Sequence, residues 1–300
     1  MSLPETYPIQ EFLDYLQFQK RFSEHTIISY RTDLRAFFDY VTTEYNIVAI
    51  QEVTPPIIRS WLSKLKSEKA ASKTINRKIS TLKSFFKYHL RLGHILMNPV
   101  SGISSLKVSR RLPVFIEEKD MEVLFRDRGF TTNWSERVAQ LILLLLYQTG
   151  IRLSELINLE ENQVDKSSSV IKVLGKGNKE RLIPVSNQLL SAIDDYLVEK
   201  RKLFTGTSNR YLLVNKKGNQ LYPRYVYNVV KENLSKVSTV QRKSPHVMRH
   251  SFATHLTNHG AQINAIKDLL GHSSLAATQI YTHNSIEKLK EVHKQAHPKS

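Results

Sequence analysis

A short segment of the chain holds residues that could bind a phosphate or a metal and move a proton. SPHVMRHSFATHL, residues 244–256, places His246 and Arg249 three positions apart and His250 one helical turn after His246. Two histidines at i and i+4 can share a helical face and bind zinc, as in the H-E-x-x-H pattern. Here Arg249 lies between them and no carboxylate close in the sequence completes three ligands, so we expect no metal site. Taken alone, the segment fits equally well a helix that packs its histidines and exposes its arginine.

Three other segments carry residues of similar chemistry. Arg152 in TGIRLSEL follows a glycine at an expected helix start, and Glu155 comes three residues later. Alone, this would be a surface ion pair worth about 0–1 kcal/mol. Lys176 in LGKGNK alone would be a solvated turn lysine. In LLGHSSLAATQIYTH, His272 falls in a turn, and Tyr281 in the next short helix alone would be a half-buried aromatic.

Together these residues form a set suited to phosphoryl transfer. Two arginines can hold the non-bridging oxygens of one phosphate and stabilise the added charge of a pentacoordinate transition state. A tyrosine hydroxyl can attack phosphorus covalently, and a lysine or histidine can supply or accept the proton. No metal is needed where the arginine pair neutralises the charge. The candidate catalytic residues are Arg152, Lys176, His246, Arg249, His272 and Tyr281.

The overall composition favours a polyanionic partner. The 300 residues include 44 Lys and Arg against 27 Asp and Glu, a net charge of +17. Such a charge repels itself in a compact fold, so we expect a polyanionic partner, with an anionic membrane surface or plain solubility as alternatives. The absence of cysteine excludes disulfides and thiolate metal sites. The chain starts without a signal-peptide pattern, and its longest apolar run, residues 141–147, is too short for a bilayer. We therefore expect a soluble cytoplasmic protein.

Helical periodicity dominates the first hundred residues. Helices are expected over residues 8–20, 23–41, 54–66 and 71–93. The apolar face of the first helix should comprise Phe12, Leu13, Leu16 and Phe18. Local start and stop signals support these bounds, because Ser23 is suited to an N-cap, Pro55 to a first helical turn and Gly93 to a helix end.

The last of these helices has an apolar stripe and a strongly basic opposite side. The stripe comprises Ile75, Ile79, Leu82, Phe86 and Leu90. The other side carries six basic residues, and the helix contains no acidic residue. Such a face is usually only solvated, but this one favours contact with phosphates. The predicted DNA-binding residues are Lys73, Arg77, Lys78, Lys83 and Lys87, with Arg91 as the sixth basic residue.

The sequence divides into two expected domains. Residues 108–113 lie in a segment with serines, prolines and basic residues but no sustained period, which predicts a linker between domains at 1–107 and 114–300. The second domain should be largely helical. Two β-rich runs around residues 175–178 predict a hairpin within it. The expected fold class is mainly α with a small antiparallel β-sheet.

The ordered motifs resemble those of the tyrosine recombinases of the phage integrase family, and in particular the bacterial Xer type. The family order is Arg, Lys, His-x-x-Arg, His or Trp, then Tyr, and this chain matches it in TGIRLSEL, LGKGNKERLIPV, SPHVMRHSFATHL and LLGHSSLAATQIYTH. The nine-residue step from His272 to Tyr281 also matches. SYRTDLRAFF and NRKISTLKSFFKY resemble the family's N-terminal helical, SAM-like core-binding domain, so the likeness extends over nearly the whole chain.

The resemblance implies a role for each member of the set. Tyr281 would attack one DNA strand, form a 3′-phosphotyrosyl link and release a 5′-hydroxyl. Arg152 and Arg249 would clamp the scissile phosphate, and Lys176 would protonate the leaving oxygen. His246 would assist proton transfer from the tyrosine.

The remaining polar residues near these motifs would have supporting roles. The resemblance implies that His272 hydrogen-bonds the phosphate and that Glu155 orients Arg152. His250 and His255 have no part in the chemistry, and we interpret them as structural, with His250 near DNA.

The resemblance also implies partners. The two domains would form a C-shaped clamp around double-stranded DNA that carries a specific recombination site. The last helix, SIEKLKEVHKQA, would be donated to a neighbour in a cyclic tetramer on two DNA sites, although it could also dock on its own domain. Such enzymes resolve chromosome dimers before cell division, often with a paralogous recombinase and under a septal DNA translocase. They need neither a cofactor nor ATP.

Three alternative functions stay open at this point. An integrase of a mobile element would use the same chemistry, although the expected absence of an extra arm-binding domain favours the Xer type. A non-cleaving architectural DNA-binding protein would not require the six-residue set, which is complete here. A relaxing enzyme of the type IB topoisomerase kind shares the chemistry but is usually larger.

Overall fold

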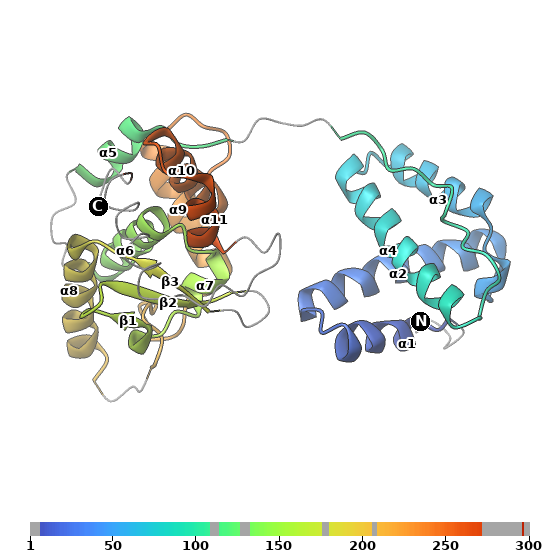
Figure 1. Cartoon of the computed structure of the whole chain (residues 1–300), viewed down its shortest axis with the longest axis horizontal. Coiled ribbons are helices and arrows are strands. Elements are labelled where there is room, and N and C mark those ends of the chain that lie inside the picture. Colours follow the sequence, from blue (N-terminus) through green and yellow to red (C-terminus); the bar gives the residue numbers. More distant parts are fainter. Residues whose placement is uncertain are drawn as a thin grey trace. The chain divides into compact units, whose positions relative to one another are not determined.

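The computed structural model describes residues 7–108, 114–126, 133–175, 180–205 and 209–271, together with Ala296. The chain divides into two units, Met1–Arg111 and Leu112–Ser300 (Figure 1). Most of the described residues are helical, and a three-stranded antiparallel sheet lies in the second unit. The expected fold class is confirmed.

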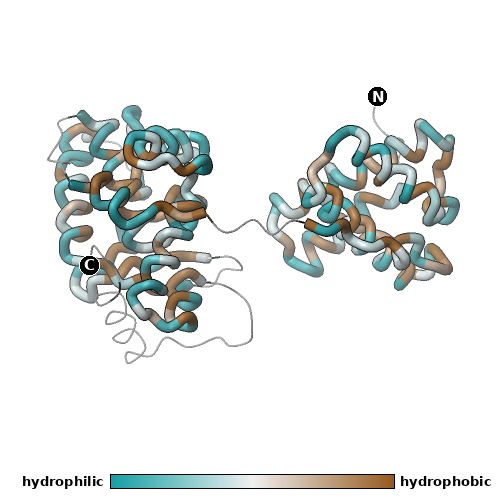
Figure 2. The backbone as a smooth tube through the Cα atoms, turned by 90° about the horizontal axis from the view of Figure 1, so that it is seen from above, coloured by the Kyte–Doolittle hydropathy of each residue, from teal (hydrophilic) through white to brown (hydrophobic). Residues whose placement is uncertain are grey.

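The N-terminal unit is built from amphipathic helices around an aromatic core. Its elements are α1 (Ile9–Asp14), a π-helical turn η1 (Tyr15–Gln19), α2 (Glu24–Tyr45), a 3₁₀ turn (Ile50–Glu52), α3 (Pro55–Ser67) and α4 (Ser72–Arg91). The N-cap at Ser23 and the proline in the first turn of α3 agree with the sequence signals. Figure 2 shows apolar segments recurring along these helices, as one-sided burial requires. The core is centred on Phe12, Phe37, Phe38, Phe85 and Phe86.

Two residues predicted for this core are not buried. Phe18 is 70% exposed and Leu90 is 39% exposed. Phe18 follows Leu16 by two positions, roughly 200° around a helix, so it cannot share the face of Leu16. The widened π turn does not bring it back to that face. Leu90 lies in the last turn of α4, at the edge of the apolar stripe.

The C-terminal unit wraps helices around one central helix with a long apolar run. That helix, α6 (Trp134–Thr149), contains the apolar run of residues 141–147, of which all but the partly buried Leu144 are buried, and it contacts α8, α9 and α10. The helices of the unit are α5 (Glu118–Arg126), α6, α7 (Leu153–Ile157), α8 (Asn187–Leu203), α9 (Pro223–Val237), α10 (Pro245–Asn258) and α11 (Ile263–Leu270). α7 ends at Ile157, and a 3₁₀ turn (Glu161–Gln163) follows it.

The sheet of this unit contains the predicted hairpin and one further strand. Its strands are β1 (Val164–Asp165), β2 (Val170–Leu174) and β3 (Glu180–Pro184), in that spatial order. β2 pairs antiparallel with β3 from Val170 opposite Pro184 to Leu174 opposite Glu180. The two-residue strand β1 is too short to have a period of its own, and sequence patterning missed it.

Gly150 fixes the sharp turn between α6 and α7. It ends α6 in the left-handed region at φ +58°, and a Cβ added here would lie 2.5 Å from Cδ1 of Phe252. We expect Gly150→Ala to destabilise the unit by about 2–4 kcal/mol, the sum of left-handed backbone strain and overpacking. Urea unfolding with and without the substitution measures this difference.

The matched control is Gly260→Ala. Gly260 has a φ of +82°, but nothing lies within 4 Å of the added Cβ. Only the backbone cost of roughly 1 kcal/mol then applies. Equal losses at Gly150 and Gly260 would show that the contact with Phe252 is unimportant.

Candidate active site

Three arginine side chains meet at the carboxyl end of α11. The last carbonyls of a helix have no partner within it, and here they accept hydrogen bonds from guanidinium groups. The bonds run from Arg181 Nε to the Leu269 carbonyl (2.9 Å), from Arg249 Nη2 to that of Leu270 (2.6 Å) and from Arg152 Nη2 to that of Gly271 (2.7 Å). The three arginines come from β3, α10 and the N-cap of α7. Two of the predicted catalytic residues, Arg152 and Arg249, are thereby brought together.

Glu155 is the carboxylate of this cluster. Both its oxygens accept from Arg181 (2.8 Å each), while Arg152 donates from its backbone N–H (2.8 Å) and from Nη1 (2.7 Å). Its side chain is only 4% exposed, so this is not the surface ion pair that the motif taken alone would indicate. Burial by itself would raise the pKa of Glu155, but the bonds from Arg181 and Arg152 hold it at about 2. Glu155 is therefore charged and holds Arg152 in place.

Arg181 is the residue that sequence analysis missed. It is as buried as Glu155, at 4% exposed, and joins β3 to both α7 and α11. The strand pattern contains a signal for it, because Arg181 and Ile183 alternate on the inward side of β3. An arginine at an inward position indicates a buried partner charge, since an unpaired buried guanidinium costs too much.

Arg249 is held mainly by backbone carbonyls. Besides Leu270, it donates from Nη1 to the carbonyl of Gly150 (2.5 Å). Burial, followed by the charges of Arg152 and Arg181, lowers the pKa of Arg249 to about 10. The group still carries its charge at neutral pH. Within the described residues these bonds use two of its five N–H donors, and three remain for a ligand.

His246 and Arg249 occupy the first two turns of the same helix. The Ser244 side chain caps α10 by accepting from the N–H of Val247 (3.3 Å). His246 is exposed in the first turn, whereas Arg249 is buried one turn later. Burial and the charge of His246 lower the pKa of His250. The helix thus presents a titratable side chain to solvent and fixes a guanidinium beneath it.

His255 has the structural role expected of it. Its Nε2 lies 2.9 Å from the Ile116 carbonyl and its Nδ1 lies 3.0 Å from the Tyr147 hydroxyl. Because a carbonyl only accepts, Nε2 carries the proton and Nδ1 accepts from the tyrosine. The lowered pKa of His255, caused by burial, keeps it in this neutral form. The Ser251 hydroxyl accepts from the Ile116 N–H (2.8 Å), so α10 holds the start of this unit by two bonds.

Three predicted catalytic residues lie outside the described part of the chain. These are Lys176, His272 and Tyr281. The described residues next to them show which elements their segments join. Lys176 belongs to the connection between β2 and β3, and His272 directly follows Gly271, whose carbonyl binds Arg152.

Comparison with known proteins identifies the family. The family model described as "Phage integrase family" matches residues 118–288, more than half of the chain, and "Phage integrase, N-terminal SAM-like domain" matches residues 9–93. The chain belongs to the phage integrase family of tyrosine recombinases. Members of this family cut and rejoin DNA strands, so the expected enzyme class is confirmed.

Curated relatives of this recombinase cover its full length. The tyrosine recombinase XerC of Listeria innocua is 38% identical over 296 residues, 97% of each chain. That of Anoxybacillus flavithermus is 34% identical over 297 residues, 98% of each chain. These names confirm the resemblance to the Xer type.

Solved structures share the recombinase fold. The XerH site-specific recombinase bound to palindromic difH substrate has a TM-score of 0.72 at 22% identity, covering 96% of this chain and 83% of that one. The Tn1549 transposon integrase in complex with circular intermediate DNA has a TM-score of 0.68 at 21% identity, covering 93% and 97%. Among the described helices of this recombinase, none is long and apolar enough to cross a membrane.

The basic side of α4 in this tyrosine recombinase is organised by a buried acid from α2. Asp33 is 1% exposed and accepts from Arg77, from Nζ of Lys78 (3.0 Å) and from the Thr81 hydroxyl (3.1 Å). Lys78 also lies over the Trp61 ring, 5.3 Å from its centre. Two of the five predicted DNA contacts are therefore paired within the unit. No ion pair is found among the described residues for the other three, which are Lys73, Lys83 and Lys87.

We expect Asp33→Asn to lower the stability of the recombinase's helical unit by about 1–3 kcal/mol. The amide keeps a hydrogen-bonding oxygen but no longer neutralises the two cations, of which Lys78 is nearly buried. Urea unfolding followed by tryptophan fluorescence measures the change. Asp39→Asn, an exposed position of α2, serves as control and should change stability by less than about 0.5 kcal/mol. Similar effects at both positions would contradict this account of Asp33.

Proposed function

We propose that the chain is a site-specific recombinase that cuts and rejoins DNA through a 3′-phosphotyrosyl intermediate. The observation that carries this proposal is the convergence of Arg152 and Arg249 on consecutive carbonyls of α11. Both guanidiniums keep donors for a phosphate, and Glu155 fixes one of them. A phosphate seated on this pair would gain charge in the transition state, where fixed cations stabilise it most.

The proposed reaction is a transesterification at phosphorus. The Tyr281 oxygen forms a bond to the scissile phosphorus while the bond from phosphorus to the 5′-oxygen breaks. His246 accepts the tyrosine proton, and Lys176 donates a proton to the 5′-oxygen. A 5′-hydroxyl of the partner duplex then attacks the phosphotyrosine and releases Tyr281. The phosphotyrosine conserves the energy of the ester bond, so ATP is not consumed.

The remaining site residues position the phosphate. We assign hydrogen bonding of the phosphate to His272, which follows the carbonyl that binds Arg152. Arg181 touches no substrate in this scheme and acts through Glu155, as a positioning residue. On the helical unit, we assign contacts with DNA phosphates to Lys73, Lys83 and Lys87 and to the partly exposed Arg77.

The biological role that we propose is the resolution of chromosome dimers at a specific site before cell division. The full-length similarity to proteins named XerC supports this role. We further propose action in the cytoplasm as a cyclic tetramer on two DNA sites, with a paralogous recombinase as partner and a septal DNA translocase as regulator. The solved XerH complex with difH supports a duplex recombination site as the ligand.

Covalent trapping tests the proposed chemistry. The protein is incubated in EDTA with a nicked duplex carrying the chromosomal recombination site, beside Tyr281→Phe, and run on a denaturing gel. We expect a shifted protein–DNA band with the wild type and none with the variant, while both shift the duplex on a native gel. If binding occurs without the covalent band, even after addition of the paralogue from the same genome, the cleavage proposal is wrong.

A further inference from the structure

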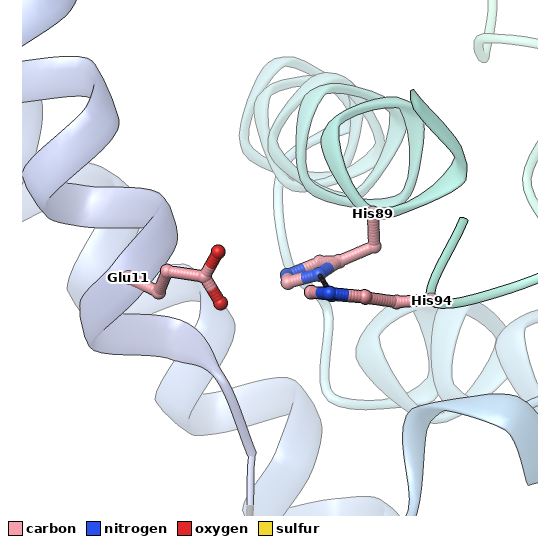
Figure 3. A group of neighbouring side chains, drawn as sticks. All are labelled: Glu11, His89 and His94. Atoms are coloured by element: carbon pink, nitrogen blue, oxygen red, sulfur yellow. Dashed lines mark hydrogen bonds between the residues drawn. The ribbon is translucent and has the colours of Figure 1, made fainter. Parts of the chain in front are cut away.

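The helical unit contains a group of potential metal ligands that is separate from the arginine cluster. Glu11 of α1, His89 of α4 and His94 just beyond α4 each offer a ligand atom within 4.8 Å of the others. Figure 3 shows the Glu11 carboxylate facing the two imidazole rings. The two histidines are close in sequence, but Glu11 lies on α1, so the fold is needed to bring the carboxylate to them.

The two imidazoles have a spacing that suits a shared metal ion. Their Nδ1 atoms lie 3.0 Å apart. Two nitrogens bound to one tetrahedral zinc ion are roughly 3.4 Å apart, given Zn–N bonds of about 2.0–2.1 Å. A small opening of the pair would therefore admit zinc. Glu11 is exposed, and a change of its rotamer can bring an oxygen to the same ion.

The surroundings of the group favour ligand chemistry. His89 is wholly buried, so packing fixes its ring with Nδ1 toward His94. The Tyr88 hydroxyl donates to Oε1 of Glu11 (2.8 Å), a bond of the kind that orients ligating carboxylates.

We propose that Glu11, His89 and His94 form a zinc-binding site that ties α1 to the end of α4. Two imidazole nitrogens and a carboxylate oxygen are common zinc ligands, and solvent can supply the fourth. Exposure of Glu11 and His94 gives the ion a path from solvent. The site would stabilise the helical unit and take no part in phosphoryl transfer.

Metal titration of the full chain tests this proposal. Protein stripped with EDTA and dialysed is titrated with Zn²⁺ by calorimetry, and with Co²⁺ while the visible absorption of tetrahedral cobalt is followed. We expect one equivalent to bind and the thermal unfolding midpoint to rise with Zn²⁺. His94→Ala and Glu11→Gln, both at exposed positions, should fold normally and weaken binding at least roughly tenfold.

Two controls separate this site from other histidines of the chain. His25→Ala removes an exposed histidine of the same unit. His250→Ala removes one of the two histidines, His246 and His250, that lie one turn apart on α10. Both should bind Zn²⁺ as the wild type does. The proposal is overturned if the wild type binds no Zn²⁺, if His94→Ala binds it unchanged, or if His250→Ala is the variant that loses it.

Discussion

Arg249→Lys should slow strand cleavage about a thousandfold while the protein stays folded and still binds DNA. The guanidinium bridges the carbonyls of Gly150 and Leu270 and is only 6% exposed. A lysine ammonium cannot span both carbonyls and also offer two parallel donors to a phosphate. Losing one preorganised charge donor at a reacting centre typically costs roughly 10²–10³ in rate, and Arg249 supplies both charge and fork geometry. Single-turnover cleavage of the nicked duplex measures the loss.

The matched control for this substitution is Arg201→Lys. Arg201 lies on α8 with a side chain 71% exposed, and it makes only a long contact of 3.8 Å with Glu161. Cleavage by this variant should stay within about twofold of the wild type, because exposed pairs contribute little. A loss of less than tenfold for Arg249→Lys, with DNA binding intact, would remove Arg249 from the phosphate clamp.

Glu155→Ala should lower the stability of the catalytic unit by about 3–5 kcal/mol. Removal of this carboxylate leaves Arg181 buried without its bidentate partner and takes the nearest negative charge from Arg152. Removing one partner of a buried ion pair typically lowers stability by about 3–5 kcal/mol, because the remaining charge stays buried without a counter-charge. For a unit of this size the thermal midpoint should fall by roughly 10 °C. Calorimetry of the full chain with and without the substitution checks it.

The neighbouring strand offers the control for Glu155. Glu180 is the residue before Arg181, and its exposed side chain pairs with Lys172 at 2.8 Å. Glu180→Ala should cost no more than about 1 kcal/mol, because both partners are in water. If Glu155→Ala is equally mild, the burial of its ion pairs does not matter for folding.

The same pair has a pH signature whose sign follows from the direction of the shift. The pKa of Glu155 is about 2 in the folded chain against an ordinary value of 4.5. A carboxyl group whose pKa is lower in the folded than in the unfolded chain stabilises the folded state at pH values above its ordinary pKa. This stabilisation is lost as the pH falls toward 2. The stability gap between wild type and Glu155→Ala should therefore be constant above about pH 4.5 and narrow below it.

Local sequence motifs were enough to group two of the candidate site residues, but they did not predict the contacts that support them. Arg152 and Arg249 could be grouped because each has a recognisable local motif, and the fold brings them to adjacent carbonyls. Arg181 and Asp33 could not, because their importance depends on partners 26 and at least 44 residues away. Burial of a charge depends on tertiary contacts, which local periodicity does not encode.

Patterning also failed where elements are short or ligands are scattered. The strand β1 has only two residues, too few to show alternation. Histidines one helical turn apart can be recognised in the sequence as possible metal ligands, whereas Glu11 and His89 are separated by 78 positions and share no local pattern. A helix with a long apolar stripe, such as α4, was predicted well because many residues repeat the same signal.

The carboxyl end of α11 and an anion bound to Arg152 and Arg249 would draw on the same two guanidinium groups. The carbonyls of this end occupy donors of Arg152 and Arg249, and the chain runs directly from Gly271 into the segment that carries His272 and Tyr281. By thermodynamic linkage, a change that undocks this end and raises the affinity of the two arginines for phosphate by some factor is itself favoured by phosphate to the same factor. A change that lowers this affinity is opposed by phosphate to the same factor. Docking of the end of α11 and binding of an anion by Arg152 and Arg249 are therefore reciprocally coupled, so each changes the free energy of the other by the same amount.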